Sequence, residues 1–347
     1  MAPGRTTPVI ADGVIILSSP LWLERSALPK SAIKLGGREV TIYCPRVPLK
    51  RVRPQDWNLL EPSTGRGRLP IATANGYVDW GNYNNTHHRL SVNALRFTAP
   101  MDPLRVDEDD TGWTDDRPLT WLREAWPSWF GTFSDWLQAW NRLSRYEGNR
   151  QSDTEIEAVA ERALLGFNGF VKGTHSIRNH GSHKASTRLE VKAAMRCANE
   201  GVRLPLRMGM IVTARTSLHS GRHRECLIDC CTATEVALVD ALKHRLLTAG
   251  LEVAALEGIV KRANSVSGLA TLAMELGLID KASFTKIKQK LAEPRNRAAH
   301  DGTPVDYSVA GEALRVASEI RDQVRPDPSP REILSGQASA GLTFDPR

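Results

Sequence analysis

Three side chains near the C-terminal end of the chain are suited to the cleavage of RNA: Arg295, Asn296 and His300. The planar guanidinium of an arginine holds a phosphate through several donors. A histidine exchanges protons near neutral pH because its unperturbed pKa is about 6.5. A structural alternative is an exposed helix whose arginine and histidine do no chemistry, with the histidine favoured by the helix dipole at the C-terminal end.

The spacing of these residues sets a condition on how they act together. On a helix, Asn296 and His300 are four residues apart and share a face. Arg295 and His300 are five residues apart, which separates them by about 140° around the helix axis. One isolated helix therefore cannot easily direct both side chains at one phosphate, and the spacing favours a homodimer in which a second copy completes the site.

The segments around these residues have the periodicity of helices. Apolar side chains recur every three or four residues in the ranges 206–218, 226–242, 256–263, 269–276, 284–300 and 309–324. We therefore expect an all-helical domain over residues 203–325. Pro294 lacks an amide hydrogen, so we expect the helix over residues 284–300 to kink there or to restart with Pro294 as its first residue.

Residues 203–325, about a third of the chain, resemble the HEPN superfamily. The resemblance rests on the R-x4-H spacing of Arg295 and His300, the polar Asn296 after the arginine, the acidic Glu235 on an earlier helix, and the order of the helices. It implies an up-and-down helical bundle. Many members of this family are metal-independent RNases of toxin, anti-phage or RNA-processing systems, and others are binding or dimerisation modules.

The resemblance also implies a role for each residue. His300 would be the general base or acid when a ribose 2'-hydroxyl attacks the adjacent phosphorus, and Arg295 would stabilise charge on the phosphoryl oxygens. Asn296 would orient the site, and Glu235 would occupy the acidic position on the earlier helix. The expected product carries a 2',3'-cyclic phosphate. Glu235 has an alternative interpretation as a helix-edge carboxylate paired with a nearby Lys or Arg.

Two functions from different classes remain open. The first is a metal-independent endoribonuclease in phage defence or a toxin system, with the N-terminal domain as sensor or substrate holder. For it we expect RNA as substrate, a homodimer, a protein partner such as an antitoxin, and neither a cofactor nor a metal. The alternative is a non-catalytic HEPN scaffold that dimerises and carries the N-terminal domain to a partner.

The rest of the chain differs from the helical domain in composition. All nine tryptophans lie between Trp22 and Trp140. Short apolar runs separated by Gly, Pro and Asn predict a β-rich domain over residues 1–105, either a small sandwich or a partial barrel. We expect a Trp-rich and basic helical connecting region over residues 106–202 and a disordered tail over residues 326–347. The fold class is then α+β with several domains.

The connecting region contains two further helical patterns and a basic stretch. Phe133, Trp136, Leu137 and Trp140 have the spacing of a helix face, which we interpret as core packing in preference to base stacking. Ser152 and Glu155 form a capping-box pattern that predicts an amphipathic helix over residues 156–170. Between residues 162 and 224 there are twelve Lys and Arg and two acidic residues, a net charge of +10 that exceeds the +7 of the whole chain.

The basic stretch is a candidate surface for the RNA backbone, because Lys and Arg neutralise phosphates without reading sequence. Its alternative is a solvated basic face. The nearby His175, His180 and His183 could bind a metal ion. This interpretation is disfavoured, since no cysteine or carboxylate accompanies them closely. The candidate RNA-binding residues are Lys172, Arg178, Lys184, Arg188 and Lys192.

The five cysteines indicate a reducing compartment. They form no C-x-x-C pair and are odd in number, and Cys226, Cys230 and Cys231 fall on the apolar side of an expected helix as buried thiols. The apolar run 14–17 is far too short for a signal peptide or a membrane span. We therefore expect a cytoplasmic protein without membrane association.

Overall fold

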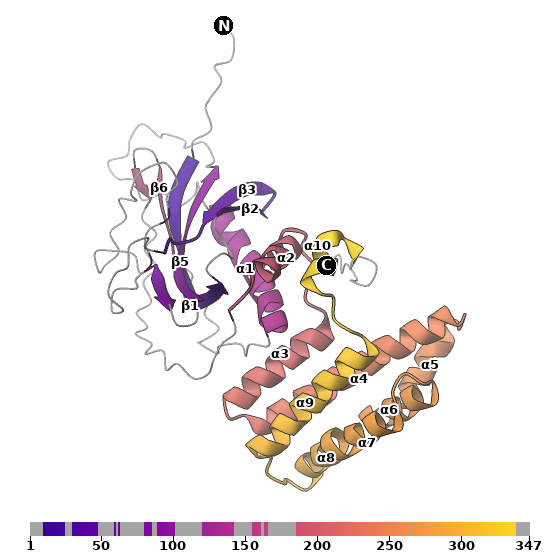
Figure 1. Cartoon of the computed structure of the whole chain (residues 1–347). Helices are drawn as coiled ribbons and strands as arrows, with labels where there is room; N and C mark the ends of the chain where they lie inside the picture. Colours follow the sequence, from indigo (N-terminus) through magenta and orange to yellow (C-terminus); the bar gives the residue numbers. More distant parts are fainter. Residues whose placement is uncertain are drawn as a thin grey trace. The chain divides into compact units, whose positions relative to one another are not determined.

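The computed structural model describes residues 10–24, 30–47, 59, 62, 80–84, 89–100, 120–141, 155–160, 163–165, 185–263 and 265–337. The chain divides into two compact units. The first comprises Met1–Leu137 with Gly148–Val202, and the second comprises Gln138–Glu147 with Arg203–Arg347. The described strands form an antiparallel sheet in the first unit, and the second unit is mostly helical, so the chain is α+β (Figure 1).

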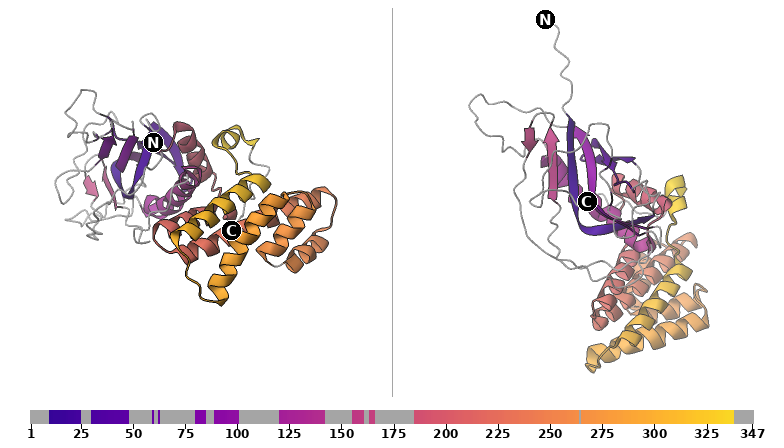
Figure 2. Two further views of the ribbon diagram at one scale, coloured as in Figure 1. Left: turned by 60° about the horizontal axis from the view of Figure 1, so that its bottom comes forward. Right: turned by 60° about the vertical axis from the view of Figure 1, so that its left-hand side comes forward.

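The sheet is built around two long neighbouring strands, β1 and β5. Its order among the described strands is β2-β3-β5-β1-β6-β7, with β4 also paired to β5. Figure 2 shows the strands from two further directions. The register of β1 on β5 shifts between Ile16 and Leu21, so a bulge interrupts the longest pairing. The strands are β1 (Ile10–Glu24), β2 (Lys30–Leu35), β3 (Arg38–Tyr43), β4 (Gly81–Asn84), β5 (Arg89–Pro100), β6 (Glu155–Ala160) and β7 (Ala163–Leu165).

Two helices, α1 (Thr120–Asn141) and α2 (Arg188–Asn199), complete the first unit, which includes α1 as far as Leu137. Trp136 is fully buried and its indole Nε1 donates to the carbonyl oxygen of Val202 at 2.9 Å. Trp129 donates to Oδ1 of Asn199, also at 2.9 Å. The burial of Trp136 and of Phe133 confirms the interpretation of this aromatic face as core packing.

The expected helix over residues 156–170 is wrong for the residues that the structure describes there. The described residues there form β6 and β7, and β6 pairs with β1, with Ile156 opposite Ile15. Glu155, Ile156 and Glu157 alternate polar and apolar, which suits a strand as well as a helix start. Pairing with β1 outweighs the local capping pattern, whose Ser152 lies outside the described residues. The connecting region is therefore not all-helical.

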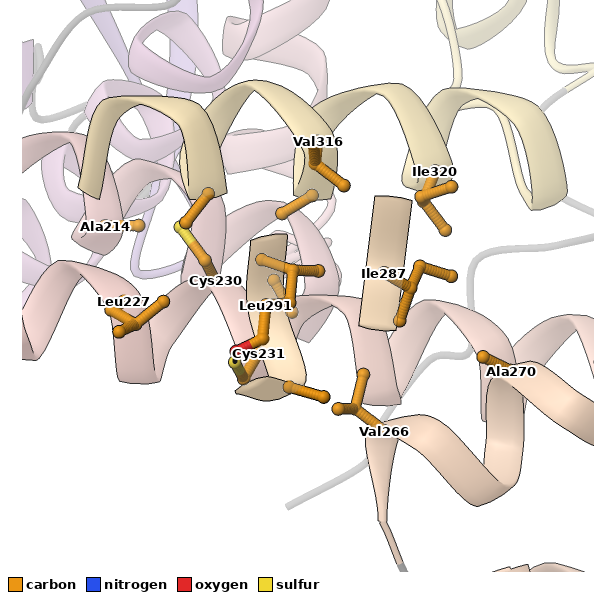
Figure 3. Packing of buried hydrophobic residues seen from close by; sticks show 14 of the residues in the cluster. Ala214, Leu227, Cys230, Cys231, Val266, Ala270, Ile287, Leu291, Val316 and Ile320 are labelled. Atoms are coloured by element: carbon orange, nitrogen blue, oxygen red, sulfur yellow. Dashed lines mark hydrogen bonds between the residues drawn. The ribbon is translucent and has the colours of Figure 1, made fainter. Parts of the chain in front are cut away.

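The second unit is organised around one long helix, α4, which packs against α3, α6 and α9. Its core includes Leu227, Cys231, Leu291 and Val316 (Figure 3). No helix in the described residues has both the length and the apolar character that crossing a membrane requires. The helices are α3 (Leu206–His219), α4 (His223–Thr248), α5 (Val253–Ala263), α6 (Val266–Glu275), α7 (Lys281–Ile287), η2 (Lys288–Ala292), α8 (Glu293–His300), α9 (Tyr307–Val324) and α10 (Pro330–Ser335).

The cysteines of α4 are buried thiols, as the sequence predicts. Cys226 donates weakly to the carbonyl oxygen of Ala310 on α9, with the sulfur 3.7 Å from the oxygen. Cys231 lies next to Leu291 and donates to its carbonyl oxygen at 3.6 Å (Figure 3). Burial raises the pKa of the Cys231 thiol to about 12. This thiol is therefore a packing element and a poor nucleophile.

The expected disordered tail is wrong for residues 326–337. Asp327 is nearly buried between two arginines, with carboxylate oxygens 3.4 Å from Arg207 Nε and 3.1 Å from Arg321 Nε. The short helix α10 follows, with a capping box formed by Ser329 and Glu332. A carboxylate that bridges two buried guanidiniums holds the segment to α3 and α9. Residues 338–347 lie outside the described part of the chain.

Candidate active site on α8

Arg295, Asn296 and His300 lie on α8, at the end of a continuous helical run that comprises α7, η2 and α8. One side of this run is anchored in the core through Ile287, Leu291, Pro294 and Ala298, which are all buried. This spacing of three or four residues is that of a helix face packed on a core. Arg295, Asn296 and His300 are all exposed, so the core does not enclose these side chains.

A π-helical turn stands directly before the three residues. The amide of Glu293 donates to the carbonyl oxygen of Lys288, five residues back, in place of the usual four. Pro294 has no amide hydrogen to continue the α-helical ladder, and its ring disfavours the regular turn before it. The wider π turn lets the chain stay helical, and α8 restarts at Glu293, one residue before the expected position.

Arg295 and Glu235 interact across two helices. Burial raises the pKa of the Glu235 carboxyl above its ordinary value, and the charge of Arg295 and the amide of Val266 act in the opposite direction. The Val266 amide, at the first turn of α6, donates a hydrogen bond to this carboxylate. Arg295 also donates to Oδ1 of Asn296 at 3.4 Å. Arg295 therefore contacts Asn296 and is close enough to Glu235 for its charge to lower the pKa of that carboxyl.

His300 stands apart from that group. Among the described residues, no hydrogen bond or ion pair joins it to Arg295, Asn296 or Glu235. It occupies the last position of α8, and Gly302, with a φ of 63°, turns the chain away from the helix. A single copy thus presents Arg295 and His300 on the same helix without bringing them together, as their angular separation of about 140° requires.

The helical run that carries the candidate site is strongly basic, a feature that the sequence analysis missed. Residues 281–300 contain six Lys and Arg and one acidic residue, Glu293. All six cationic side chains are exposed, and Lys286 pairs with Glu319 on α9 at 3.1 Å. The signal for it is in the sequence, since six cations and one acidic residue fall within a segment of helical periodicity. The cations are Lys281, Lys286, Lys288, Lys290, Arg295 and Arg297.

The predicted RNA-binding residues are only partly described. Arg188 and Lys192 lie on α2 in the first unit and are exposed. Lys172, Arg178 and Lys184 fall outside the described residues, as do His175, His180 and His183. In the part of the chain that is described, no group of three or more His, Cys, Asp or Glu side chains is arranged to hold a metal ion.

No family model matches the chain, and no curated protein or solved structure is significantly similar to it. Its function is therefore inferred from the chemistry of its own residues.

Proposed function

We propose that the second unit is a metal-independent endoribonuclease of the HEPN type. The observation that carries this proposal is the exposure of Arg295, Asn296 and His300 on a short helix whose opposite side is buried. The six exposed cations of residues 281–300 supply a surface that attracts the phosphate backbone. A phosphate binder and a proton-transfer group thus share one basic helix.

The reaction follows from these side chains. The 2'-hydroxyl of a ribose attacks the adjacent phosphorus, the bond to the 5'-oxygen of the next nucleotide breaks, and a 2',3'-cyclic phosphate forms. His300 takes the proton from the 2'-hydroxyl or gives one to the leaving 5'-oxygen. Arg295 stabilises the charge that grows on the non-bridging oxygens, and Asn296 orients the phosphate. Glu235 holds Arg295 electrostatically from α4.

A second copy of the chain completes the site in this proposal. Arg295 and His300 are about 140° apart on α8, so Arg295 of one copy and His300 of the other act on one phosphate. Residues 203–325 then form an up-and-down bundle that dimerises, and the sheet of the first unit is a sandwich or partial barrel that senses a trigger or holds the substrate. We place such an enzyme in the cytoplasm, in phage defence or a toxin system with an antitoxin partner.

A non-catalytic scaffold is the second candidate, and one observation favours it. Glu235 already has a structural task, because it accepts the amide of Val266 at the start of α6. Its electrostatic attraction to Arg295 then only joins α4 to α8, as the helix-edge interpretation expects. In this case the exposed cations of α8 bind an acidic partner, and His300 does no chemistry.

The test compares three proteins on total RNA, with and without EDTA: the wild type, His300→Ala and Arg297→Ala. Arg297 is the matched control, because it is an exposed cation on the same helix at a position that the R-N-x-x-x-H pattern leaves unspecified. At saturating RNA, His300→Ala should lower the rate by about 10²- to 10⁴-fold, and Arg297→Ala by a few-fold at most. Cleavage that EDTA stops and Mg²⁺ restores, or that survives in His300→Ala, would contradict the proposal.

A further inference from the structure

A groove of about 460 Å³ lies in the first unit, between the strand β2 and the helix α2. β2 is at the end of the strand order, and β3 is its only partner among the described strands. The groove therefore runs along an edge of the sheet. Its lining residues are Ser31, Ala32 and Lys34 from β2 and Lys192, Met195, Arg196, Asn199 and Glu200 from α2.

The backbone direction of β2 follows from its hairpin. Gly36 and Gly37 both have positive φ values, of 52° and 79°, as in the type I' turn that joins two strands through two residues. Leu35 and Arg38 then form a hydrogen-bonded pair, and such pairs alternate along an antiparallel ladder. Lys34 and Ala32 therefore direct their amide and carbonyl groups away from β3.

The Lys34 amide confirms this direction, because it donates to Oδ1 of Asn199 at 3.0 Å. The side-chain carbonyl of Asn199 stands where the carbonyl of a neighbouring strand would accept, and Trp129 also donates to it at 2.9 Å. Two residues along, the outward amide and carbonyl of Ala32 have no hydrogen-bond partner among the described residues. Among the described residues, the outward amide of Lys34 is thus satisfied, whereas the outward amide and carbonyl of Ala32 are open.

The charge of the groove selects for acidic side chains. Lys34, Lys192 and Arg196 contribute positive charge, and the single acidic lining residue, Glu200, pairs with Arg196 at 2.8 Å. An open edge offers a donor and an acceptor side by side, which matches a peptide backbone, whereas the RNA backbone has acceptor phosphates and lacks amide donors. We propose that an extended acidic peptide binds here as an additional strand on β2, with its carboxylates toward Lys34 and Lys192.

The first test of this proposal uses the full-length protein and a fluorescein-labelled peptide that alternates glutamate and valine, with binding followed by anisotropy. Ala32→Pro removes the outward amide and no β2–β3 hydrogen bond, and edge strands tolerate proline in that orientation. It should weaken binding by about fivefold, the effect of one hydrogen bond of about 1 kcal/mol. Lys34→Glu with Lys192→Glu should weaken it by at least about tenfold. Lys243→Glu with Arg245→Glu, the same charge change on two exposed residues of α4, should have no effect.

A change in the peptide gives a second test that does not depend on the folding of any variant. Methylation of every backbone amide of the peptide leaves its side-chain charges intact and blocks both of its edges from pairing with a strand, so it should abolish binding. Equal binding of the methylated and unmethylated peptides would overturn the proposal. So would equal binding of a peptide in which lysine replaces each glutamate. A single-stranded RNA that displaces the peptide and binds the Ala32→Pro variant as tightly as the wild type would instead assign the groove to nucleic acid.

Discussion

Two inactive variants should restore RNA cleavage when they are mixed, if the site is shared between two copies. Arg295→Ala and His300→Ala each remove one of the two side chains that lie about 140° apart on α8. A dimer with one copy of each variant has two sites: one lacks both side chains and the other has both. With equal amounts and free exchange, about half of the dimers are mixed, so the expected rate is about a quarter of the wild-type rate.

The assay for this restoration is the cleavage of a fluorescence-quenched RNA after the two variants are mixed and allowed to exchange. Each variant alone should retain on the order of 1% of the wild-type rate or less, so a quarter of that rate is easily detected. In the control, the double variant Arg295→Ala with His300→Ala takes the place of the His300→Ala variant. Its mixture with the Arg295→Ala variant should stay inactive, because neither copy then supplies Arg295. Different tags on the two variants show whether mixed dimers form. If they form and the mixture is no more active than each variant alone, the shared site is refuted.

Three further predictions follow from the second unit. Because burial raises the pKa of Glu235, its neutral form is favoured in the fold; this stabilisation is present below the ordinary carboxyl pKa and is lost as pH rises through the raised value. Glu235→Gln keeps an acceptor for the Val266 amide, so urea unfolding should show it gaining stability relative to the wild type between about pH 4 and pH 7; an advantage that shrinks with pH would be inconsistent with this sign. Gly302→Ala should lower the unfolding free energy by about 1 kcal/mol because φ is positive there, whereas Gly311→Ala within α9 should raise it by about 0.5 kcal/mol in thermal melts. Lys288→Ala should weaken RNA binding similarly across sequences and make the salt slope shallower by up to ~0.7, and an unchanged slope would exclude a phosphate contact there.

Helical periodicity predicted much of the second unit. The stripe that includes Cys226, Cys230 and Ala237 indicated a long, deeply packed helix, and α4 buries these residues. Such a pattern is reliable because a helix that buries one face must repeat its apolar residues every three or four positions. The buried state of the thiols followed from the same stripe.

Local signals failed where pairing with distant residues decided the structure. The capping pattern at residues 152–155 is a property of a few neighbouring residues, whereas β6 depends on β1, more than a hundred residues away. The tail shows a different error. Ser329 and Glu332 form a capping pattern with Pro330 at the helix start, a signal that was present in the sequence and outweighed by the Pro and Gly content around it.

The candidate site was only partly visible in the sequence. The types and spacing of Arg295, Asn296 and His300 were readable because they lie on one helix. The interaction of Arg295 with Glu235 depends on the packing of α8 against α4, which periodicity does not determine. The groove beside β2 was not predictable either, since Lys34 and Asn199 are 165 residues apart and meet only in the folded chain.

The chemistry of the cleaved ends tests the central claim most directly. The wild type is incubated in EDTA with a short RNA and with the same RNA carrying a single 2'-deoxyribose at the cleaved position, and the products are identified by mass spectrometry. Attack by the 2'-hydroxyl predicts a 2',3'-cyclic phosphate and a 5'-hydroxyl from the first RNA, and an intact chain at the deoxy position of the second. A 5'-phosphate product, or cleavage at the deoxy position, would contradict the assignment of Arg295 and His300 to this reaction.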